Sequence, residues 1–173
     1  MMKIGQKGLK KQAGFNLIEL LLALGIIVIL FLGVFVTYNM VRSQTESNAA
    51  SKQILAIRSG VKTLYAGKST YGTASINQAL ITGASLPQDV RTGAGGTLFN
   101  QWNGSIDVTG ATNTFTIKYQ AVPQDACVKV VSDTVASGWQ SVAVGATVVA
   151  NDPVAIATAC ATAPTSTIVW TSL

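Results

Sequence analysis

An unbroken run of seventeen apolar or glycine residues, 20–36, limits the folds open to this chain more than any other feature. With its flanks it forms a segment of 24 residues, 15–38. A helix rises about 1.5 Å per residue, so a segment of this length can span the ~30 Å hydrocarbon core of a bilayer. The sequence therefore predicts a membrane-spanning helix close to the N-terminus.

The charge that precedes the apolar run indicates its orientation. The 173-residue chain has a formal net charge of +5, and four of its twelve cations lie before Gly14: Lys3, Lys7, Lys10 and Lys11. Lysines ahead of an apolar segment indicate that this end stays in the cytoplasm. The later residues carry eight cations and seven acids. They show no basic run with interleaved aromatic residues, which argues against a specific nucleic-acid site.

Two fates are open to such a segment, removal as a signal peptide or retention as an anchor. The run is longer than the ~7–15 apolar residues of a signal peptide, and no small-x-small cleavage site follows it closely. The nearest candidate, Ser47-Asn48-Ala49, ends thirteen residues beyond Val36. We therefore expect a retained helix.

One carboxylate, Glu19, stands directly before the apolar run. A charged side chain within a bilayer costs roughly 2.5–3.5 kcal/mol on insertion scales, so such a residue is a candidate for a specific role with a partner of opposite charge. The alternative is that Glu19 is tolerated at the membrane interface, where the first turn of the helix keeps its carboxylate in water.

The helix is expected to continue beyond the membrane, because no proline or glycine follows Tyr38 until Gly60. Apolar residues recur there at spacings of three and four: Ala50, Ile54, Ile57, Val61 and Leu64. Such a stripe indicates one buried helix face. Gly67 is a stop signal. Residues 15 to about 66 are thus predicted to form one helix, whose second half packs against the chain's own globular part.

The residues after Gly67 predict a mixed domain. Segments 105–109 and 114–119 alternate apolar and polar residues, which is typical of a hairpin with one buried face. Further strands are expected within 139–149 and at 167–171, with short helices at 76–81 and 126–136. The expected fold class is α+β, in which a long N-terminal helix, half transmembrane and half amphipathic, packs against a small antiparallel sheet.

The chain has two cysteines, Cys127 and Cys160, and no histidine. Two thiols without a histidine cannot form an ordinary zinc site. A domain exported beyond the inner membrane meets oxidising conditions, which favours a disulfide over the alternative of two buried free thiols.

Signals for catalysis are weak. The absence of histidine removes the commonest general base and any Ser-His or Cys-His pair. The glycine-rich stretch 93–96 lacks the lysine of a phosphate-binding loop. Four carboxylates are isolated from one another along the chain: Asp107, Asp125, Asp133 and Asp152. The sequence predicts no catalytic residues, no metal site and no cofactor.

The stretch Gly14-Phe15-Asn16-Leu17-Ile18-Glu19, between a basic leader and an apolar helix, resembles the prepilin processing site of type IV pilins. The stretches NQWNGSIDV, FTIKYQAVPQDAC and TIVWTS are similar to the type IVb pilins of enteric adhesive pili and plasmid-encoded thin pili. The apolar helix also lacks the proline that is usual in the type IVa branch. The cysteine pair matches the disulfide-bounded region of such pilins, so the resemblance extends over nearly the whole chain.

The resemblance implies processing by a membrane aspartic peptidase, the prepilin peptidase. This enzyme cleaves after the glycine and methylates the new amino terminus, here between Gly14 and Phe15. The implied regions are a cleaved leader at 1–14, a transmembrane and filament-core helix at 15–38, its amphipathic continuation at 39–67 and a globular head at 68–173. The ammonium of Phe15 would then pair with Glu19 of its own or a neighbouring subunit, which offsets the cost of burying either charge.

The resemblance also implies a function and partners. We expect the major structural subunit of a type IVb pilus, which polymerises with copies of itself for adhesion, aggregation or mating-pair contact. Its other partners would be the membrane before assembly, the prepilin peptidase and the inner-membrane assembly machinery. It would lie first in the inner membrane and then in the extracellular pilus. The alternatives are a minor pilin, a type II secretion pseudopilin, a membrane-anchored periplasmic binding domain and a periplasmic enzyme.

Overall fold

The computed structural model describes residues 16–173, so the leader 1–14 and the predicted cleavage site between Gly14 and Phe15 lie outside the described residues. The chain divides into two compact units with a boundary between Met40 and Val41. The described part of the first unit is helical from Leu17 onward, and the second unit contains the sheet.

Helix α1 spans Leu17–Leu64, 48 residues. It begins where the amides of Glu19 and Leu20 donate to the carbonyl oxygen of Asn16, at 2.9 and 3.1 Å. Three residues beyond its end, Gly67 has a φ of +78°, a left-handed conformation that glycine adopts without steric cost. The chain therefore turns away from the helix at the glycine that the sequence indicated.

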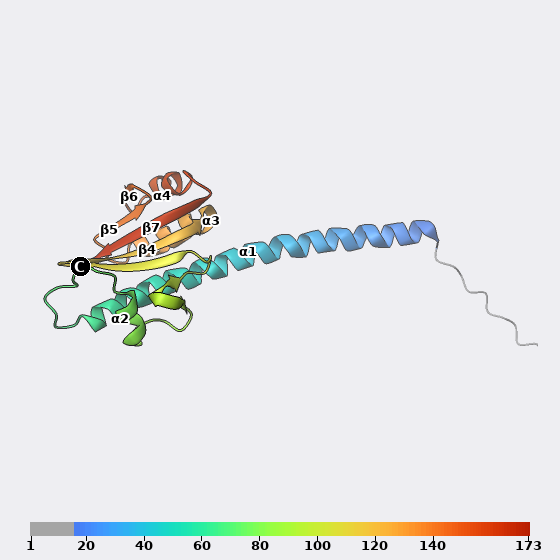
Figure 1. Ribbon diagram of the computed structural model, residues 1–173. Coiled ribbons are helices and arrows are strands. Elements are labelled where there is room, and N and C mark those ends of the chain that lie inside the picture. The colour runs from blue at the N-terminus through green and yellow to red at the C-terminus, as the bar shows by residue number, and fades with distance from the viewer. Residues whose placement is uncertain (1–15) are drawn as a thin grey trace, which may run out of the picture. The chain divides into compact units, whose positions relative to one another are not determined.

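Seven antiparallel strands form one sheet in the second unit, in the order β1-β2-β3-β4-β7-β5-β6. Their bounds are β1 Arg91–Thr92, β2 Leu98–Phe99, β3 Ser105–Ala111, β4 Thr114–Pro123, β5 Ser141–Val144, β6 Thr147–Val149 and β7 Thr165–Ser172. The C-terminal strand β7 lies in the middle, between β4 and β5 (Figure 1). The sheet is thus complete only when the last residues of the chain are in place.

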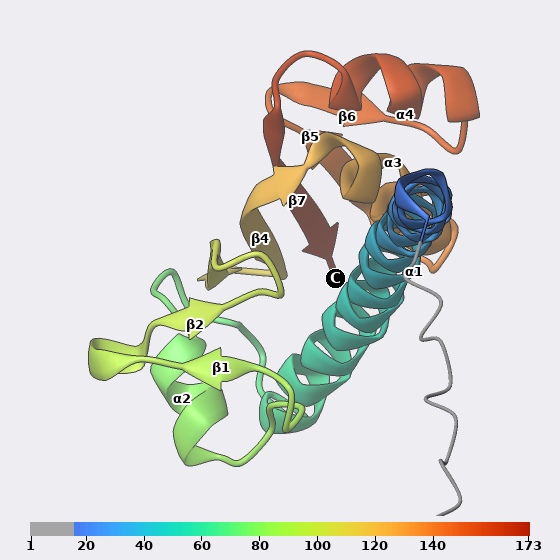
Figure 2. The same cartoon turned by 90° about the vertical axis from the view of Figure 1, so that its right-hand side faces the viewer.

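Three short helices accompany the sheet: α2 Asn77–Thr82, α3 Gln124–Val135 and α4 Pro153–Cys160. Within the second unit, α3 and the end of α1 lie on the same side of the central strands, and α2 lies with β1 and β2 near the C-terminal end of α1 (Figure 2). Helix α4 lies beside β6 (Figure 1). The helices predicted at 76–81 and 126–136 correspond to α2 and α3.

The core lies between α1 and the inner face of the sheet. The predicted stripe on α1 is confirmed, because Ala50, Ile54, Ile57 and Val61 are fully buried and Leu64 is packed against the core. The sheet contributes alternate residues of its three central strands, all of them buried: Ile106, Val108, Phe115, Ile117, Tyr119, Ile168 and Trp170. The expected α+β fold is therefore present.

The predicted hairpin pairs Ile106 with Tyr119 and Val108 with Ile117. It is longer than predicted, because Gly110 and Ala111 continue β3. Near the far end of β4 the register shifts between Tyr119 and Val122, and this irregularity lets β4 extend to Pro123.

Candidate assembly surfaces

The first unit of the chain exposes apolar side chains on every face of α1. An 18-residue window of this helix has a mean hydropathy of 3.0, and none of the window is buried, so the helix is long and apolar enough to cross a membrane. Each of the following side chains up to Met40 is at least 46% exposed: Leu17, Ile18, Leu20, Leu21, Leu22, Leu24, Ile26, Ile27, Val28, Ile29, Leu30, Phe31, Leu32, Val34, Phe35, Val36, Tyr38 and Met40. A helix that is apolar all round is suited to lipid or to the interior of a bundle.

Glu19 is the only charged residue between Asn16 and Val41. It lies in the first turn of α1 and its side chain is exposed. A carboxylate in this turn is stabilised by the unpaired amides and the positive end of the helix dipole, typically by about 0.3–1 kcal/mol at an exposed site. Its expected partner, the amino group of Phe15, belongs to a residue outside the described part of the chain.

Polar contacts begin where the apolar run ends. Arg42 Nε lies 2.7 Å from Glu46 Oε1, one helical turn later. Exposed pairs of this kind contribute about 0–1 kcal/mol. Ser43 donates a 2.6 Å hydrogen bond to Asp125 Oδ2 at the start of α3. The second contact joins α1 to the globular part four residues before its buried face begins at Ser47.

Arg58 holds the C-terminal part of the chain against α1. Its Nε donates to Ser172 Oγ at 3.1 Å, and its two terminal nitrogens donate to the carbonyl oxygens of Ser137 at 2.6 Å and Gly138 at 2.5 Å. The guanidinium also lies 4.5 Å from the ring centroid of Trp139, a cation–π distance. The sequence did not predict a role for Arg58, because an isolated arginine on a helix has no local signal for such contacts.

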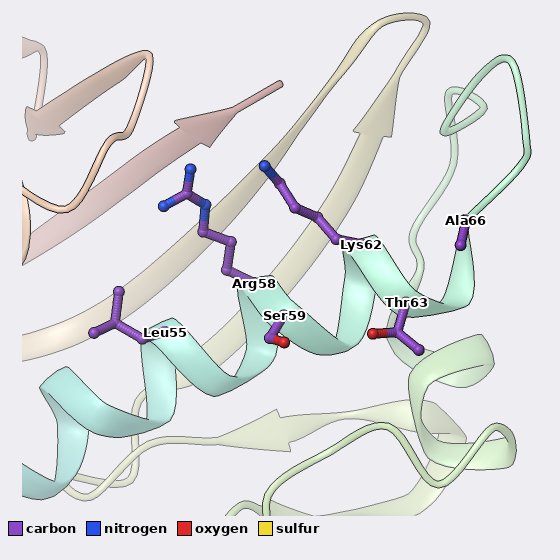
Figure 3. Close-up of a pocket in the computed structure, with 6 residues that line it drawn as sticks. All are labelled: Leu55, Arg58, Ser59, Lys62, Thr63 and Ala66. Atoms are coloured by element: carbon purple, nitrogen blue, oxygen red, sulfur yellow. The ribbon is translucent and has the colours of Figure 1, made fainter.

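A pocket open to solvent lies along α1, lined by Leu55, Arg58, Ser59, Lys62, Thr63 and Ala66 (Figure 3). Arg58 and Lys62 point to one side of the helix, toward the sheet, and Ser59 and Thr63 do not (Figure 3). The lining offers cations and hydroxyls but no carboxylate, thiol or imidazole that could act as a general base.

The four carboxylates that the sequence left isolated are also apart in the structure. Asp107 accepts hydrogen bonds from Ser105 and Gln120 at 3.3 and 3.0 Å. Asp133 pairs with Lys129 at 3.2 Å, and Asp152 caps α4 by accepting from the Val154 amide at 3.0 Å. Among residues 16–173, no group of three or more potential metal ligands is found.

Cys127 of α3 and Cys160 of α4 form a disulfide, with a Cα–Cα distance of 5.9 Å. The predicted pairing is confirmed. Both cysteines are fully buried, so the bond joins the two helices from inside. It closes a loop with a sequence separation of 33 that contains β5, β6 and α4.

Comparison with known proteins adds a family and a fold. A family model described as PilS N terminal matches residues 44–173. The structure is similar to a type IVb pilin from Salmonella typhi, with a TM-score of 0.60 and 22% identity over 71% of this chain and 97% of that chain. It is also similar to TcpA, a type IV pilin from the El Tor biotype of Vibrio cholerae, with a TM-score of 0.55 and 11% identity over 75% of this chain and 99% of that chain. No match is found among curated protein sequences.

Proposed function

The chain belongs to the PilS N-terminal family and is a type IV pilin most similar to the type IVb group, and from this premise we propose that it is the major structural subunit of a type IVb pilus. The observation that carries the proposal is the fully exposed apolar half of α1, which continues as one helix into a folded head with a disulfide. A large exposed apolar surface of this kind marks a site that contacts a membrane or another protein. Lipid buries this surface before assembly, and other copies of the helix bury it in the filament.

Polymerisation through the helix follows from elementary energetics. Each apolar side chain of the first unit gains about 25 cal/mol for every Å² that it removes from water. Once subunits leave the bilayer, packing these helices together is therefore strongly favoured over exposing them. The charged and polar residues that begin at Arg42 then remain outside this apolar core.

We also propose how the subunit is processed and where it is located. A prepilin peptidase removes the leader 1–14 by cleaving between Gly14 and Phe15, and Phe15 becomes N-methylated. Residues 15–38 anchor the subunit in the inner membrane and then form the filament core, 39–67 continue the helix, and 68–173 form the head. The inner-membrane assembly machinery transfers the subunit from this pool into an extracellular pilus.

Assembly is also the activity that the head supports better than catalysis or cofactor binding. The proteins that this chain resembles in structure are pilins. The pocket on α1 has no carboxylate, thiol or imidazole in its lining. Four carboxylates of the head make local contacts: Asp107, Asp125, Asp133 and Asp152.

Mass spectrometry of filaments sheared from cells tests the proposal. We expect this chain to be the dominant protein, with the intact mass of residues 15–173, one disulfide and one added methyl group. A Gly14→Val variant should remain in the membrane as uncut precursor, because the peptidase requires a small residue before the cut. A trace amount in the filaments would instead favour a minor pilin. A pseudopilin would be absent from surface filaments, and an uncut monomer would favour a membrane-anchored binding domain.

A further inference from the structure

The turn between β2 and β3 contains the only Asn-Gly pair in the sequence, Asn103-Gly104. Asparagine is a thermolabile residue, and its side-chain carboxamide reacts most readily when the next residue is glycine. The attacking atom is the backbone nitrogen of that next residue, and a glycine has no side chain to shield it. Asn103 is exposed and has a φ of +64°, a left-handed conformation that asparagine tolerates. The pair is therefore a candidate site of spontaneous modification.

The reaction at such a pair uses water and needs neither an enzyme nor a cofactor. The backbone nitrogen of Gly104 forms a bond with Cγ of Asn103, and the bond between Cγ and Nδ2 breaks. Nδ2 leaves as ammonia, together with the proton of the Gly104 amide. Water then opens the resulting succinimide ring. One direction of opening gives aspartate. The other gives isoaspartate, in which the main chain runs through the former side chain and is one carbon longer.

In the folded head the attacking amide is already occupied. The Gly104 amide donates a buried hydrogen bond of 2.8 Å to Oδ1 of Asn100. Asn100 is 1% exposed, and its Nδ2 donates to the carbonyl oxygen of Gln120 at 2.7 Å. The Asn100 amide also donates to the Gly104 carbonyl oxygen at 2.9 Å, which closes the turn. Attack by the Gly104 nitrogen requires its bond to Asn100 to break, because the attack removes the proton that this bond uses.

The carboxamide of Asn103 is held as well. Arg91 Nη2 donates to Asn103 Oδ1 at 2.6 Å and to the main-chain carbonyl oxygen of Asn100 at 3.0 Å. One guanidinium thus joins β1 to both ends of the turn. The bond to Arg91 restricts the orientation of the carboxamide, so a change in that orientation loses a hydrogen bond to a charged group.

The folded turn has no room for the longer product. Gly104 is buried, and a Cβ added to it would overlap the carbonyl oxygen of Gln120. An isoaspartate directly before Gly104 adds one main-chain atom at this close approach, so it would displace Gly104 and break the hydrogen bonds to Asn100. An aspartate at the same position keeps the main chain unchanged, and its carboxylate would pair with the Arg91 guanidinium.

We propose that Asn103 is a modification site that reacts in the unfolded chain and is protected in the folded head by Asn100 and Arg91. A chain that stays unfolded is converted at this site, and its isoaspartate form can no longer close the turn between β2 and β3. Rapid folding of the head keeps the site intact. All of these residues lie in the head, so the site does not depend on assembly into a filament.

Incubation of the full chain in detergent and mildly alkaline buffer, with and without guanidinium chloride and a reductant, tests the proposal. Trypsin cleaves after Arg91 and Lys118, so mass spectrometry of one peptide reports both Asn103 and Asn113. The second asparagine is an internal reference, because it is exposed in the turn between β3 and β4 but precedes Thr114. Asn103 should be converted at least about ten times faster in the unfolded chain than in the folded chain. Asn113 should change little in either sample.

Each half of the proposal can fail in this experiment. Equal rates of conversion at Asn103 in the two samples would overturn the protection. An unfolded chain whose Asn103 is no more reactive than Asn113 would overturn the reactivity. Labelling with an isoaspartate-specific methyltransferase after removal of the denaturant should find isoaspartate in the misfolded fraction and not in the folded fraction.

Variants identify the protecting contacts. Arg91 is exposed, so Arg91→Ala should leave the head folded and raise the conversion of Asn103 in the folded chain several-fold. Lys68→Ala is the matched control, because it removes an exposed cation outside the turn and should have no effect. Asn100→Ala should have a larger effect, because it frees the Gly104 amide. Where circular dichroism shows that Asn100→Ala is unfolded, Arg91→Ala alone decides. A folded Arg91→Ala chain that converts Asn103 at the wild-type rate would overturn the assigned role of Arg91.

Discussion

Tyr119 of β4 donates a 2.8 Å hydrogen bond to Gln53 Oε1 of α1, and both side chains are buried. The Tyr119 ring also packs edge-on against Trp170 of β7, with 5.5 Å between ring centroids. One side chain thus joins the long helix to the two central strands. Its environment also affects its ionisation, because burial, with a smaller effect from the Asp89 carboxylate, raises the pKa of Tyr119 well above its ordinary value.

We expect Tyr119→Phe to lower the free energy of unfolding of the head by about 1–3 kcal/mol. The substitution keeps the ring but leaves Gln53 Oε1 buried without a donor, and an unsatisfied buried group costs about this much. The Nε2 of the same glutamine is already buried without a partner. Urea unfolding of a chain that begins at Ser43, and so lacks the apolar segment but keeps Gln53, measures the change, with Tyr71→Phe as the control. Tyr71 is only partly buried and packs its ring on Phe115 at 5.0 Å. Equal stability of the two variants would contradict the prediction.

The raised pKa of Tyr119 also predicts how stability depends on alkaline pH. In the unfolded chain this tyrosine loses its proton near pH 10, whereas in the folded head it keeps it to higher pH. Between these two values the unfolded state binds fewer protons, so the free energy of unfolding falls as pH rises, by up to about 1.4 kcal/mol per pH unit. Below about pH 10 this contribution is fully present. Urea titrations at several pH values above 9 should show a shallower fall for Tyr119→Phe than for the wild type.

The second half of α1 should be indispensable to the head. A chain that begins at Ser43 lacks the apolar segment but keeps the buried stripe from Ser47 to Val61, so it should be soluble, folded and monomeric. A chain that begins at Ser69 exposes the inner face of the sheet and should aggregate. Size-exclusion chromatography and circular dichroism distinguish the two. A well-folded Ser69 chain would show that the sheet does not need the helix.

Local patterns explain why much of this fold could be predicted. The period of Ile54, Ile57 and Val61 indicates a buried helix face, and the alternation around Ile106 and Ile117 indicates paired strands, because each signal lies within one segment. The insertion of β7 between β4 and β5 could not be read in this way, since its partners lie far away along the chain. Helix α4 had a start signal in Asp152 followed by Pro153, but with eight residues it is too short for a clear period.

The candidate site residues also differ in whether the sequence alone could identify them. The sequence alone singled out Glu19, because it is a charged residue next to a long apolar run, and the two cysteines, because the chain has no others. Arg58 became visible only in three dimensions. The contacts of Arg58 reach Ser137 and Ser172, about 80 to 115 residues away along the chain.

Removal of the disulfide should destabilise the head strongly. In the chain-entropy model, closing a loop of this size stabilises the fold by about 3.5–4 kcal/mol, a large part of a small domain's typical 5–15 kcal/mol. Cys127→Ser combined with Cys160→Ser removes the bond without leaving a free thiol. The urea concentration at the midpoint of unfolding should be well below the wild-type value for this double variant, and less of the variant should accumulate in cells. An unchanged midpoint would show that packing between α3 and α4 is sufficient.

Substitution of Glu19 distinguishes two possible roles of this carboxylate in the apolar helix. If it is only tolerated at the membrane interface, Glu19→Gln should leave cleavage and pilus formation intact, because an amide is also stable there. If it is the partner of a neighbouring Phe15 amino group, the variant should still be inserted and cleaved, since the peptidase mainly requires Gly14. The two views therefore differ in filament formation and agree on processing.

We expect Glu19→Gln, as the only pilin in the cell, to accumulate as processed subunit in the inner membrane with few surface pili. The Phe15 ammonium would then enter the apolar filament core without a counter-charge, and an unpaired buried charge costs about 3–5 kcal/mol. Glu46→Gln is the matched control, because it removes the same charge from a local pair with Arg42 beyond the apolar segment and should assemble normally. Immunoblots of membrane and sheared fractions, with the mass of the processed chain, measure both steps. Normal piliation by Glu19→Gln would show that no charge pair forms in the core, since the amide cannot neutralise the neighbouring ammonium.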